Sequence, residues 1–201
     1  MAKRQATTRI IAGKFRGTKL TFKPNKSLRP TESKTKETLF NWLLNDLDNK
    51  NCLDMFAGTG SLGFEALSRG AKEVIFIEKQ KSLCNSIEEI AKQLGIKKKC
   101  RIINANSTSI NFINLKDKFD LIFLDPPFHE NLIQRSLDII DKNALLAKNG
   151  LVYIECEKDF DINSLKTKLS QMKQSKGCLL YTSDAADERS SVDLGARRII
   201  K

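Results

Sequence analysis

The feature that most constrains the fold is an alternation of short apolar segments with amphipathic helical segments between residues 52 and 157. The apolar segments are CLDMF (52–56), EVIFIE (73–78), CRIIN (100–104), FDLIFLD (119–125) and GLVYIECE (150–157). Between these segments, in residues 61–70, 80–95 and 130–141, the apolar side chains recur at the spacing of an amphipathic helix. Buried strands separated by helices are typical of a parallel sheet covered on both faces. We therefore predict an α/β fold with a doubly wound sheet.

A different pattern precedes this alternation. Residues 7–22, TTRIIAGKFRGTKLTF, alternate apolar and basic side chains around Gly13 and Gly17, which predicts a small β-hairpin with a basic face. Thr31 is a suitable N-cap for a following helix, with Glu32 in its first turn. The apolar side chains expected along that helix are Leu39, Phe40, Leu43, Leu44 and Leu47.

The chain carries a formal net charge of +11, and much of the excess lies near its start. Residues 1–37 contain two acidic residues, Glu32 and Glu37, and a larger basic set: Lys3, Arg4, Arg9, Lys14, Arg16, Lys19, Lys23, Lys26, Arg29, Lys34 and Lys36. A general surface bias would be spread more evenly. The distribution favours a polyanionic partner such as nucleic acid, bound through phosphate contacts.

Other features narrow the class of protein. No apolar run is long enough to cross a bilayer, and no apolar stretch follows the basic start as a secretory signal requires. The five cysteines are scattered, and His129 is the single histidine. We therefore expect no metal site, no disulfide framework, no membrane partner and a cytoplasmic location.

The candidate chemistry follows four successive strands, at ends that meet on one edge of a parallel sheet. After the first strand comes GTGSLG, Gly58 to Gly63, a G-x-G-x-x-G pattern that often marks a dinucleotide site. Asp54 stands in front of it and would repel a pyrophosphate. The same carboxylate would attract the α-ammonium of S-adenosylmethionine (SAM), which has no phosphate. The loop therefore favours SAM over NAD.

Further cofactor contacts are expected from the neighbouring strand ends. Glu78 could accept hydrogen bonds from both ribose hydroxyls, a role shared by SAM and NAD sites, and Asn106 could offer its amide to adenine. The predicted cofactor-binding residues are Asp54, Phe56, Gly58, Gly60, Gly63, Glu78 and Asn106.

The fourth strand ends in Asp-Pro-Pro-Phe, residues 125–128. Two prolines lock an extended turn and hold the Asp125 carboxylate and the Pro126 carbonyl as fixed acceptors. These acceptors can grip the N–H bonds of an aromatic amino group and favour attack by its lone pair. Phe128 offers a face to an unstacked base. Asp125, Pro126 and Phe128 are thus the predicted catalytic group, without a metal, and His129 is expected to be an exposed turn residue.

Five segments in this order resemble the bacterial 16S rRNA guanine-N2 methyltransferase D family: RIIAGKFRG, LRPTESKTKETLFNWL, CLDMFAGTGSLGFEALSRGA, IEKQ and LDPPF. The likeness runs from about Arg9 to about Glu157. It implies a Rossmann-like SAM-dependent enzyme that methylates N2 of guanine 966 in 16S rRNA, acting on the 30S subunit. It also places Arg9, Lys14, Arg16, Lys19 and Arg29 in an RNA-facing part. We expect a monomer.

The resemblance suggests a division of the chain. Residues 1–50 would form the basic hairpin and helix within the same domain, and residues 51–177 the SAM-binding catalytic domain. Family members usually close the sheet with an antiparallel hairpin, whereas residues 178–201 show no pattern of a final strand pair. We therefore expect an atypical tail, a candidate for non-native sequence, and an incomplete sheet edge.

Three alternatives remain open from the residues. A DNA adenine-N6 or cytosine-N4 methyltransferase would share SAM and the Asp-Pro-Pro-aromatic motif. An NAD-dependent oxidoreductase would use the glycine pattern. A non-catalytic RNA-binding protein would have a vestigial pocket, which the intact residues 125–128 argue against.

Overall fold

The computed structural model describes residues 6–22, 33–43, 47–112, 115, 118–127, 131–157, 159–175 and 177–183. Near the start, β1 (Ala6–Arg9) and β2 (Lys19–Phe22) pair antiparallel as a separate two-stranded sheet. The helix α1 (Ser33–Trp42) follows. The predicted hairpin is confirmed, with residues 10–18 forming its connection.

The main sheet has seven strands in the order β5-β4-β3-β6-β7-β9-β8. Its strands are β3 (Asn51–Asp54), β4 (Glu73–Glu78), β5 (Cys100–Asn104), β6 (Phe119–Leu124), β7 (Leu146–Glu155), β8 (Ser170–Ser175) and β9 (Cys178–Thr182). The first five in this order pair parallel, and β9 pairs antiparallel with both β7 and β8. The predicted doubly wound α/β sheet is confirmed.

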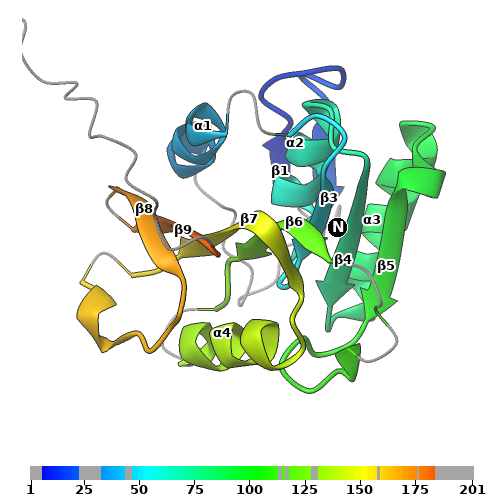
Figure 1. Ribbon diagram of the computed structural model, residues 1–201. Coiled ribbons are helices and arrows are strands. Elements are labelled where there is room, and N and C mark those ends of the chain that lie inside the picture. Colours follow the sequence, from blue (N-terminus) through cyan, green and yellow to red (C-terminus); the bar gives the residue numbers. More distant parts are fainter. Residues whose placement is uncertain are drawn as a thin grey trace, which may run out of the picture.

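Helices lie on both faces of this sheet (Figure 1). The connecting helices are α2 (Ser61–Ser68), α3 (Lys81–Gln93) and α4 (Leu132–Lys142), with short 3-10 turns η1 (Lys97–Lys99) and η3 (Ile162–Ser164). α4 lies on the face opposite α1 and α2 (Figure 1). Successive side chains of a strand point to opposite faces, so each buried strand supplies both layers of core.

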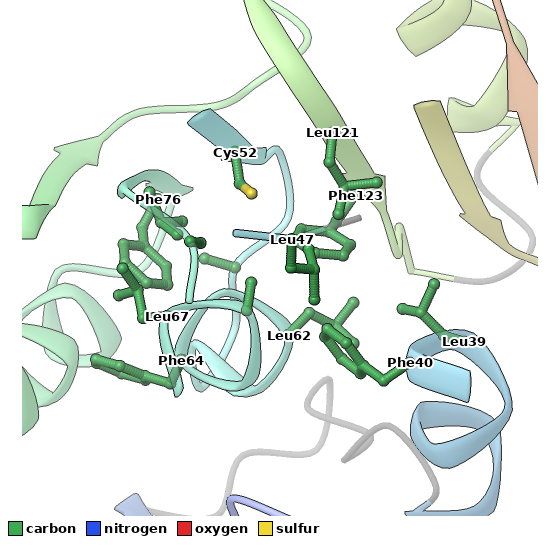
Figure 2. Packing of buried hydrophobic residues seen from close by; sticks show 14 of the residues in the cluster. Leu39, Phe40, Leu47, Cys52, Leu62, Phe64, Leu67, Phe76, Leu121 and Phe123 are labelled. Carbon is green, nitrogen blue, oxygen red and sulfur yellow. The ribbon is translucent and has the colours of Figure 1, made fainter. Parts of the chain in front are cut away.

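The two faces have separate hydrophobic cores. Phe76, Phe123 and Tyr153 point to the face that carries α1 and α2, while Ile122 and Val152 belong to the core of the other face. Figure 2 shows the first core, where α2 lies among side chains of the sheet and α1. Phe40 of α1 meets Phe123 with ring centroids 6.2 Å apart. The hairpin adds Ile10 and Leu20 to the same core.

The helix α1 is shorter than the apolar spacing predicted. It ends at Trp42, and Leu47 lies beyond it, although Leu47 is still buried in the core that contains Phe40. The expected cap and first turn, Thr31 and Glu32, lie outside the described residues, as does Leu44. The periodic pattern therefore identified the buried residues correctly, but it extended the helix beyond its end at Trp42.

The expectation of an incomplete sheet edge was wrong. Residues 178–182 form β9, and Cys178, Leu179, Leu180 and Tyr181 are buried against β7 and the core. With β8 they make the antiparallel hairpin that closes the sheet. The sheet therefore continues past residue 177, and the rest of the tail, from residue 184, lies outside the described residues. None of the helices in the described part of the chain is long and apolar enough to cross a membrane.

Candidate active site

The predicted site residues come together at the carboxyl ends of neighbouring parallel strands. β5, β4, β3 and β6 are adjacent, so Asn104, Glu78, Asp54 and Asp125 follow one another along a single edge. This is the edge at which ligands bind in open α/β sheets. Asp54 stands at the centre of it, between the glycine loop and the Asp-Pro-Pro turn.

The glycine loop turns sharply between β3 and α2. Gly58 and Gly60 have φ angles of 53° and 77°, the left-handed region that side chains with a Cβ rarely adopt. Around Gly58 the space is open, since an added Cβ would meet only the Phe56 carbonyl oxygen at 3.9 Å. The backbone can therefore approach a ligand closely at this position.

The third glycine of the pattern, Gly63, has a packing role. A Cβ on Gly63 would collide with the Phe76 ring of β4, so this glycine allows α2 to pack tightly on the sheet. The Gly63 amide faces the Asp54 carboxylate. Phe56 is half-buried against the second core. Gly63 thus supports the loop through packing and through one backbone amide.

Asp54 is the most unusual ionisable group of the site. Its exposed fraction is 1%, and neither carboxylate oxygen accepts a well-formed hydrogen bond from the described residues. Burial, followed by the nearby Asp125 charge, raises the pKa of the Asp54 carboxyl to about 8, and the amides of Gly63 and Phe56 offset this only in part. Buried carboxylates are normally paired. The side chain therefore calls for a cationic or donor-rich ligand.

Glu78 fixes the loop to the end of β4. One carboxylate oxygen accepts a hydrogen bond from the Gly58 amide at 2.8 Å, and the other accepts one from Gln80 at 2.7 Å. Each oxygen has a second lone pair for a ligand hydroxyl. The backbone behind Glu78 is held as well, because Asn104 Nδ2 donates to its carbonyl at 2.9 Å.

Asn106 caps a turn after β5. Its side-chain oxygen accepts hydrogen bonds from the Thr108 amide at 3.0 Å and the Thr108 hydroxyl at 2.9 Å. The residue is exposed, so its amide nitrogen can still serve as a donor at the edge of the site.

The Asp-Pro-Pro turn borders a cleft. Asp125 is half-buried and Pro126 is buried directly after β6, whereas Phe128 and His129 lie outside the described residues. Pro126 and Pro127 line a cavity of about 480 Å³ between the start of α4, the end of β7 and the segment 159–166. Among the described side chains, no group of three His, Cys, Asp or Glu residues could hold a metal ion.

Four predicted RNA-binding residues share the hairpin. Arg9, Lys14, Arg16 and Lys19 are all exposed, and Arg29 lies outside the described residues. Arg9 and Lys19 stand directly opposite each other in the β1–β2 pairing. Like charges in this position destabilise a hairpin unless an anion lies between them.

Sequence reasoning missed the polar network that holds this hairpin on α2. The Glu65 carboxylate is fully buried and accepts hydrogen bonds from the Ile11 amide at 2.7 Å and the Ala12 amide at 3.0 Å. It also pairs with Arg69 at 2.9 Å and lies 3.7 Å from the Lys36 ammonium. A charged residue inside the apolar run LGFEAL was the signal available in the sequence.

Lys36 joins the same network and is not part of the basic surface. It is 1% exposed and donates hydrogen bonds to the Arg9 carbonyl at 2.6 Å and to Ser61 Oγ at 3.0 Å. Burial lowers the pKa of Lys36, while the Glu65 carboxylate acts in the opposite direction. Because Ser61 opens α2 beside Gly60, the network connects the hairpin directly to the glycine loop.

Comparisons with known proteins agree with this geometry. Residues 8–182 match the family model described as "Conserved hypothetical protein 95". The chain is 45% identical over 157 residues to "Ribosomal RNA small subunit methyltransferase D" of Haemophilus influenzae, covering 75% of this chain and 79% of the relative. The namesake from Escherichia coli K12 is 38% identical over 152 residues, covering 74% of each.

A solved structure shows the same fold. "Putative methyltransferase yhhF from Escherichia coli" superposes with a TM-score of 0.76 at 31% identity, covering 90% of this chain and 100% of that one. The family match also ends at residue 182, the last residue of β9. Sequence, fold and site geometry agree, and the chain belongs to the ribosomal RNA small subunit methyltransferase D family.

Proposed function

We propose that this chain is a SAM-dependent methyltransferase that modifies the exocyclic N2 of a guanine in 16S rRNA, guanine 966 in the family numbering, within the 30S subunit. The observation that carries the proposal is the buried Asp54 carboxylate, without a well-formed partner among the described residues, between the glycine loop and Asp125. The curated relatives are named as methyltransferases of small-subunit rRNA, which supports the acceptor class.

The residues at the edge of the sheet fit SAM. Asp54 can accept hydrogen bonds from the α-ammonium, an interaction that removes the cost of leaving this carboxylate unpaired. Glu78, already oriented by Gly58 and Gln80, can accept hydrogen bonds from the ribose hydroxyls. SAM supplies a methyl group activated by the adjacent sulfonium cation.

The chain itself prepares the acceptor amine. The Asp125 carboxylate and the Pro126 carbonyl accept hydrogen bonds from the two N–H groups of the exocyclic amino group. These hydrogen bonds weaken delocalisation of the nitrogen lone pair into the ring. As the nitrogen–carbon bond forms, the methyl–sulfur bond would break and S-adenosylhomocysteine would leave. Positive charge builds on the nitrogen, and Asp125 stabilises it and takes up the released proton. No covalent enzyme intermediate is needed, so positioning is the main contribution.

The exposed basic hairpin supports docking on ribosomal RNA. Arg9, Lys14, Arg16 and Lys19 can neutralise phosphates, and the opposed pair Arg9–Lys19 favours an anion bound between its two side chains. Phosphate contacts position a protein on a shaped RNA surface without reading a duplex sequence.

The test is transfer of tritiated methyl groups from SAM to three acceptors: 30S particles lacking the modification, naked 16S rRNA and duplex DNA. We expect label in the 30S particles above all. Label in DNA alone would support the DNA amino-methyltransferase and refute the proposal. A variant carrying Arg9→Glu and Lys19→Glu should lose transfer to particles while keeping its melting-temperature shift with S-adenosylhomocysteine.

A further inference from the structure

Three segments of the chain meet at one buried ammonium group, that of Lys36 in α1. The side chain is 1% exposed, and its Nζ donates to the Arg9 carbonyl oxygen at 2.6 Å and to Ser61 Oγ at 3.0 Å. Its third neighbour is the Glu65 carboxylate at 3.7 Å. An ammonium group has three donors and no acceptor, so one donor is available for each partner. The donors of Lys36 are therefore committed to protein groups rather than to a ligand.

Two of these partners belong to the parts of the chain that the proposed function uses. Arg9 lies on the exposed basic hairpin, and its backbone carbonyl is the group that Lys36 holds. Ser61 is the first residue of α2 and directly follows Gly60 of the glycine loop. The contacts from the Arg9 carbonyl through Lys36 to Ser61 Oγ, here called the Lys36 bridge, thus join the proposed RNA-docking surface to the proposed cofactor loop.

The hairpin has other attachments to α2 that do not involve Lys36. At the end of α2, the Ser68 carbonyl accepts a hydrogen bond from the Lys14 amide at 2.7 Å, and Ser68 Oγ accepts one from the Phe15 amide at 2.9 Å. In the middle of α2, the Glu65 carboxylate accepts hydrogen bonds from the amides of residues 11 and 12. Removing the ammonium group therefore leaves the hairpin on α2 and cuts only its connection to the start of that helix.

Stability alone does not account for a lysine at this position. A buried charge carries a large desolvation penalty, and an apolar side chain of similar length is often tolerated in its place. Without Lys36, the Glu65 carboxylate keeps Arg69 as a cationic partner at 2.9 Å, besides the two hairpin amides. The distinctive property of Lys36 is therefore its place between the hairpin and the glycine loop.

We propose that Lys36 is a positioning residue, which fixes the basic hairpin relative to the glycine loop and so aligns docked RNA with the cofactor. The hairpin would hold RNA phosphates, and the loop the methyl donor. These two parts must keep a fixed geometry, because a misplacement of about 1 Å can lower a rate about a hundredfold. The inference rests on the proposed function, and Lys36 acts through Arg9 and Ser61 rather than by touching a substrate.

The test is single-turnover methyl transfer from saturating SAM to 30S particles lacking the modification, with the chain in excess and its concentration varied. The plateau rate reports alignment, and the half-saturating concentration reports docking. Lys36→Met should lower the plateau rate at least fivefold and change the half-saturating concentration less than twofold. The affinity for S-adenosylhomocysteine, measured by calorimetry, should also change less than twofold, because Asp54 and Glu78 are intact.

Two exposed lysines provide matched controls for this substitution. Lys19→Met removes a charge from the hairpin surface, so it should raise the half-saturating concentration and leave the plateau rate nearly unchanged. Lys92→Met, in the last turn of α3, should change neither quantity. The substitution of a buried and of an exposed lysine should thus affect different kinetic parameters.

A second variant cuts the Lys36 bridge from the other side. Ser61→Ala removes only the hydroxyl that Lys36 holds, and it should lower the plateau rate in the same direction by a smaller factor. In the double variant with Lys36→Met, the loss should not exceed that of Lys36→Met alone, because both substitutions cut the same connection. If Lys36→Met does not fold, the plateau rate of Ser61→Ala decides.

Several results would overturn the positioning role. They are an unchanged plateau rate in folded Lys36→Met, an equal loss of S-adenosylhomocysteine affinity, or a change confined to the half-saturating concentration. Losses that multiply in the double variant with Ser61→Ala would also contradict it. Absence of transfer to the particles by the unmodified chain would instead overturn the proposed function.

Discussion

Asp54 is held at the end of β3 with its carboxylate buried and its proton affinity raised. Burial and the Asp125 charge raise its pKa to about 8, against about 3.9 in an unfolded chain. Between these values the folded chain holds a proton that the unfolded chain has lost. Raising the pH through this window therefore lowers the stability of the ligand-free protein. An ammonium group bound next to Asp54 lowers the pKa of the carboxyl again, because it stabilises the ionised form.

Cofactor binding should accordingly release a proton. Between pH 6 and 8 the affinity for S-adenosylhomocysteine should tighten by up to about tenfold per pH unit and then level off near pH 8. Calorimetry in two buffers with different ionisation enthalpies measures the proton directly. Asp54→Asn should bind more weakly and lose the pH dependence. An affinity that does not change from pH 6 to 8 in the unmodified chain would contradict the proposed role of Asp54.

Asp125 should separate binding from chemistry. We expect Asp125→Ala to lower methyl transfer by at least about a hundredfold, since it removes the acceptor that stabilises charge on the amine. The melting-temperature shift with S-adenosylhomocysteine should remain. Asp141→Asn, an exposed carboxylate of α4 paired with Lys168, is the control and should keep full activity. Activity retained in Asp125→Ala would remove this carboxylate from the mechanism.

Among the elements, the hairpin and α2 form one unit. Ser68 Oγ accepts a hydrogen bond from the Phe15 amide at 2.9 Å, and the Ser68 carbonyl accepts one from the Lys14 amide at 2.7 Å. Gly13 approaches this carbonyl so closely that a Cβ would collide with it. The basic surface is therefore positioned by the helix that begins at the glycine loop.

Two glycines of the hairpin offer a matched comparison. Gly13 and Gly17 have φ angles of 79° and 84°, so alanine is strained at both, by about 1 kcal/mol. An added Cβ meets nothing within 4 Å at Gly17 but strikes the Ser68 backbone at Gly13. Gly13→Ala should therefore lower the melting temperature clearly more than Gly17→Ala. Equal losses in the two variants would show that the hairpin does not pack on α2 as described.

Elements with strong periodic patterns could be predicted from the sequence. EVIFIE coincides with β4, because a buried parallel strand is apolar along its whole length. CRIIN coincides with β5, an edge strand that is only partly buried. β8 was missed because SQMKQS is an exposed edge strand with no alternation to detect. The Glu65 network was missed for another reason: its partners are backbone amides of residues 11 and 12, which the sequence does not place near α2.

At the scale of the whole molecule, the last described hairpin, β8 and β9, completes the main sheet. The family match ends at residue 182, and β9 buries Leu179, Leu180 and Tyr181. Each large side chain of this kind contributes roughly 1.5–3 kcal/mol when fully buried, and a domain is stable by only about 5–15 kcal/mol. The sequence analysis began the atypical tail at residue 178, and this boundary was wrong, since CLLYT (178–182) carries strand-forming side chains and forms β9.

Two truncations test this boundary. A chain ending at Lys176 lacks β9 and should be unfolded or lose most of its stability. A chain ending at Ser183 keeps β9 and should retain the melting temperature and the response to S-adenosylhomocysteine of the full chain. Thermal unfolding followed by circular dichroism measures both. Equal stability of the two truncated chains would show that β9 does not contribute to the sheet as described.

The placement of the candidate residues on one sheet edge could be predicted, because they follow strand ends and the strand order brings such ends together. Asp54 and Asp125 are separated by some seventy residues of chain, but Asp54 ends β3 and Asp125 directly follows the adjacent strand β6. The sequence could not predict how deeply each of these groups is buried or which groups it bonds to and packs against. Burial of Asp54, the two amides on Glu78 and the packing role of Gly63 depend on tertiary contacts.

The central claim is the chemical identity of the product, and nucleoside mass spectrometry measures it most directly. The purified chain is incubated with SAM and 30S particles lacking the modification, and the 16S rRNA is then digested to nucleosides. We expect one N2-methylguanosine per particle, and none when Asp125→Ala replaces the unmodified chain. A methylated adenosine or cytidine, or methylation at another guanine atom, would contradict it.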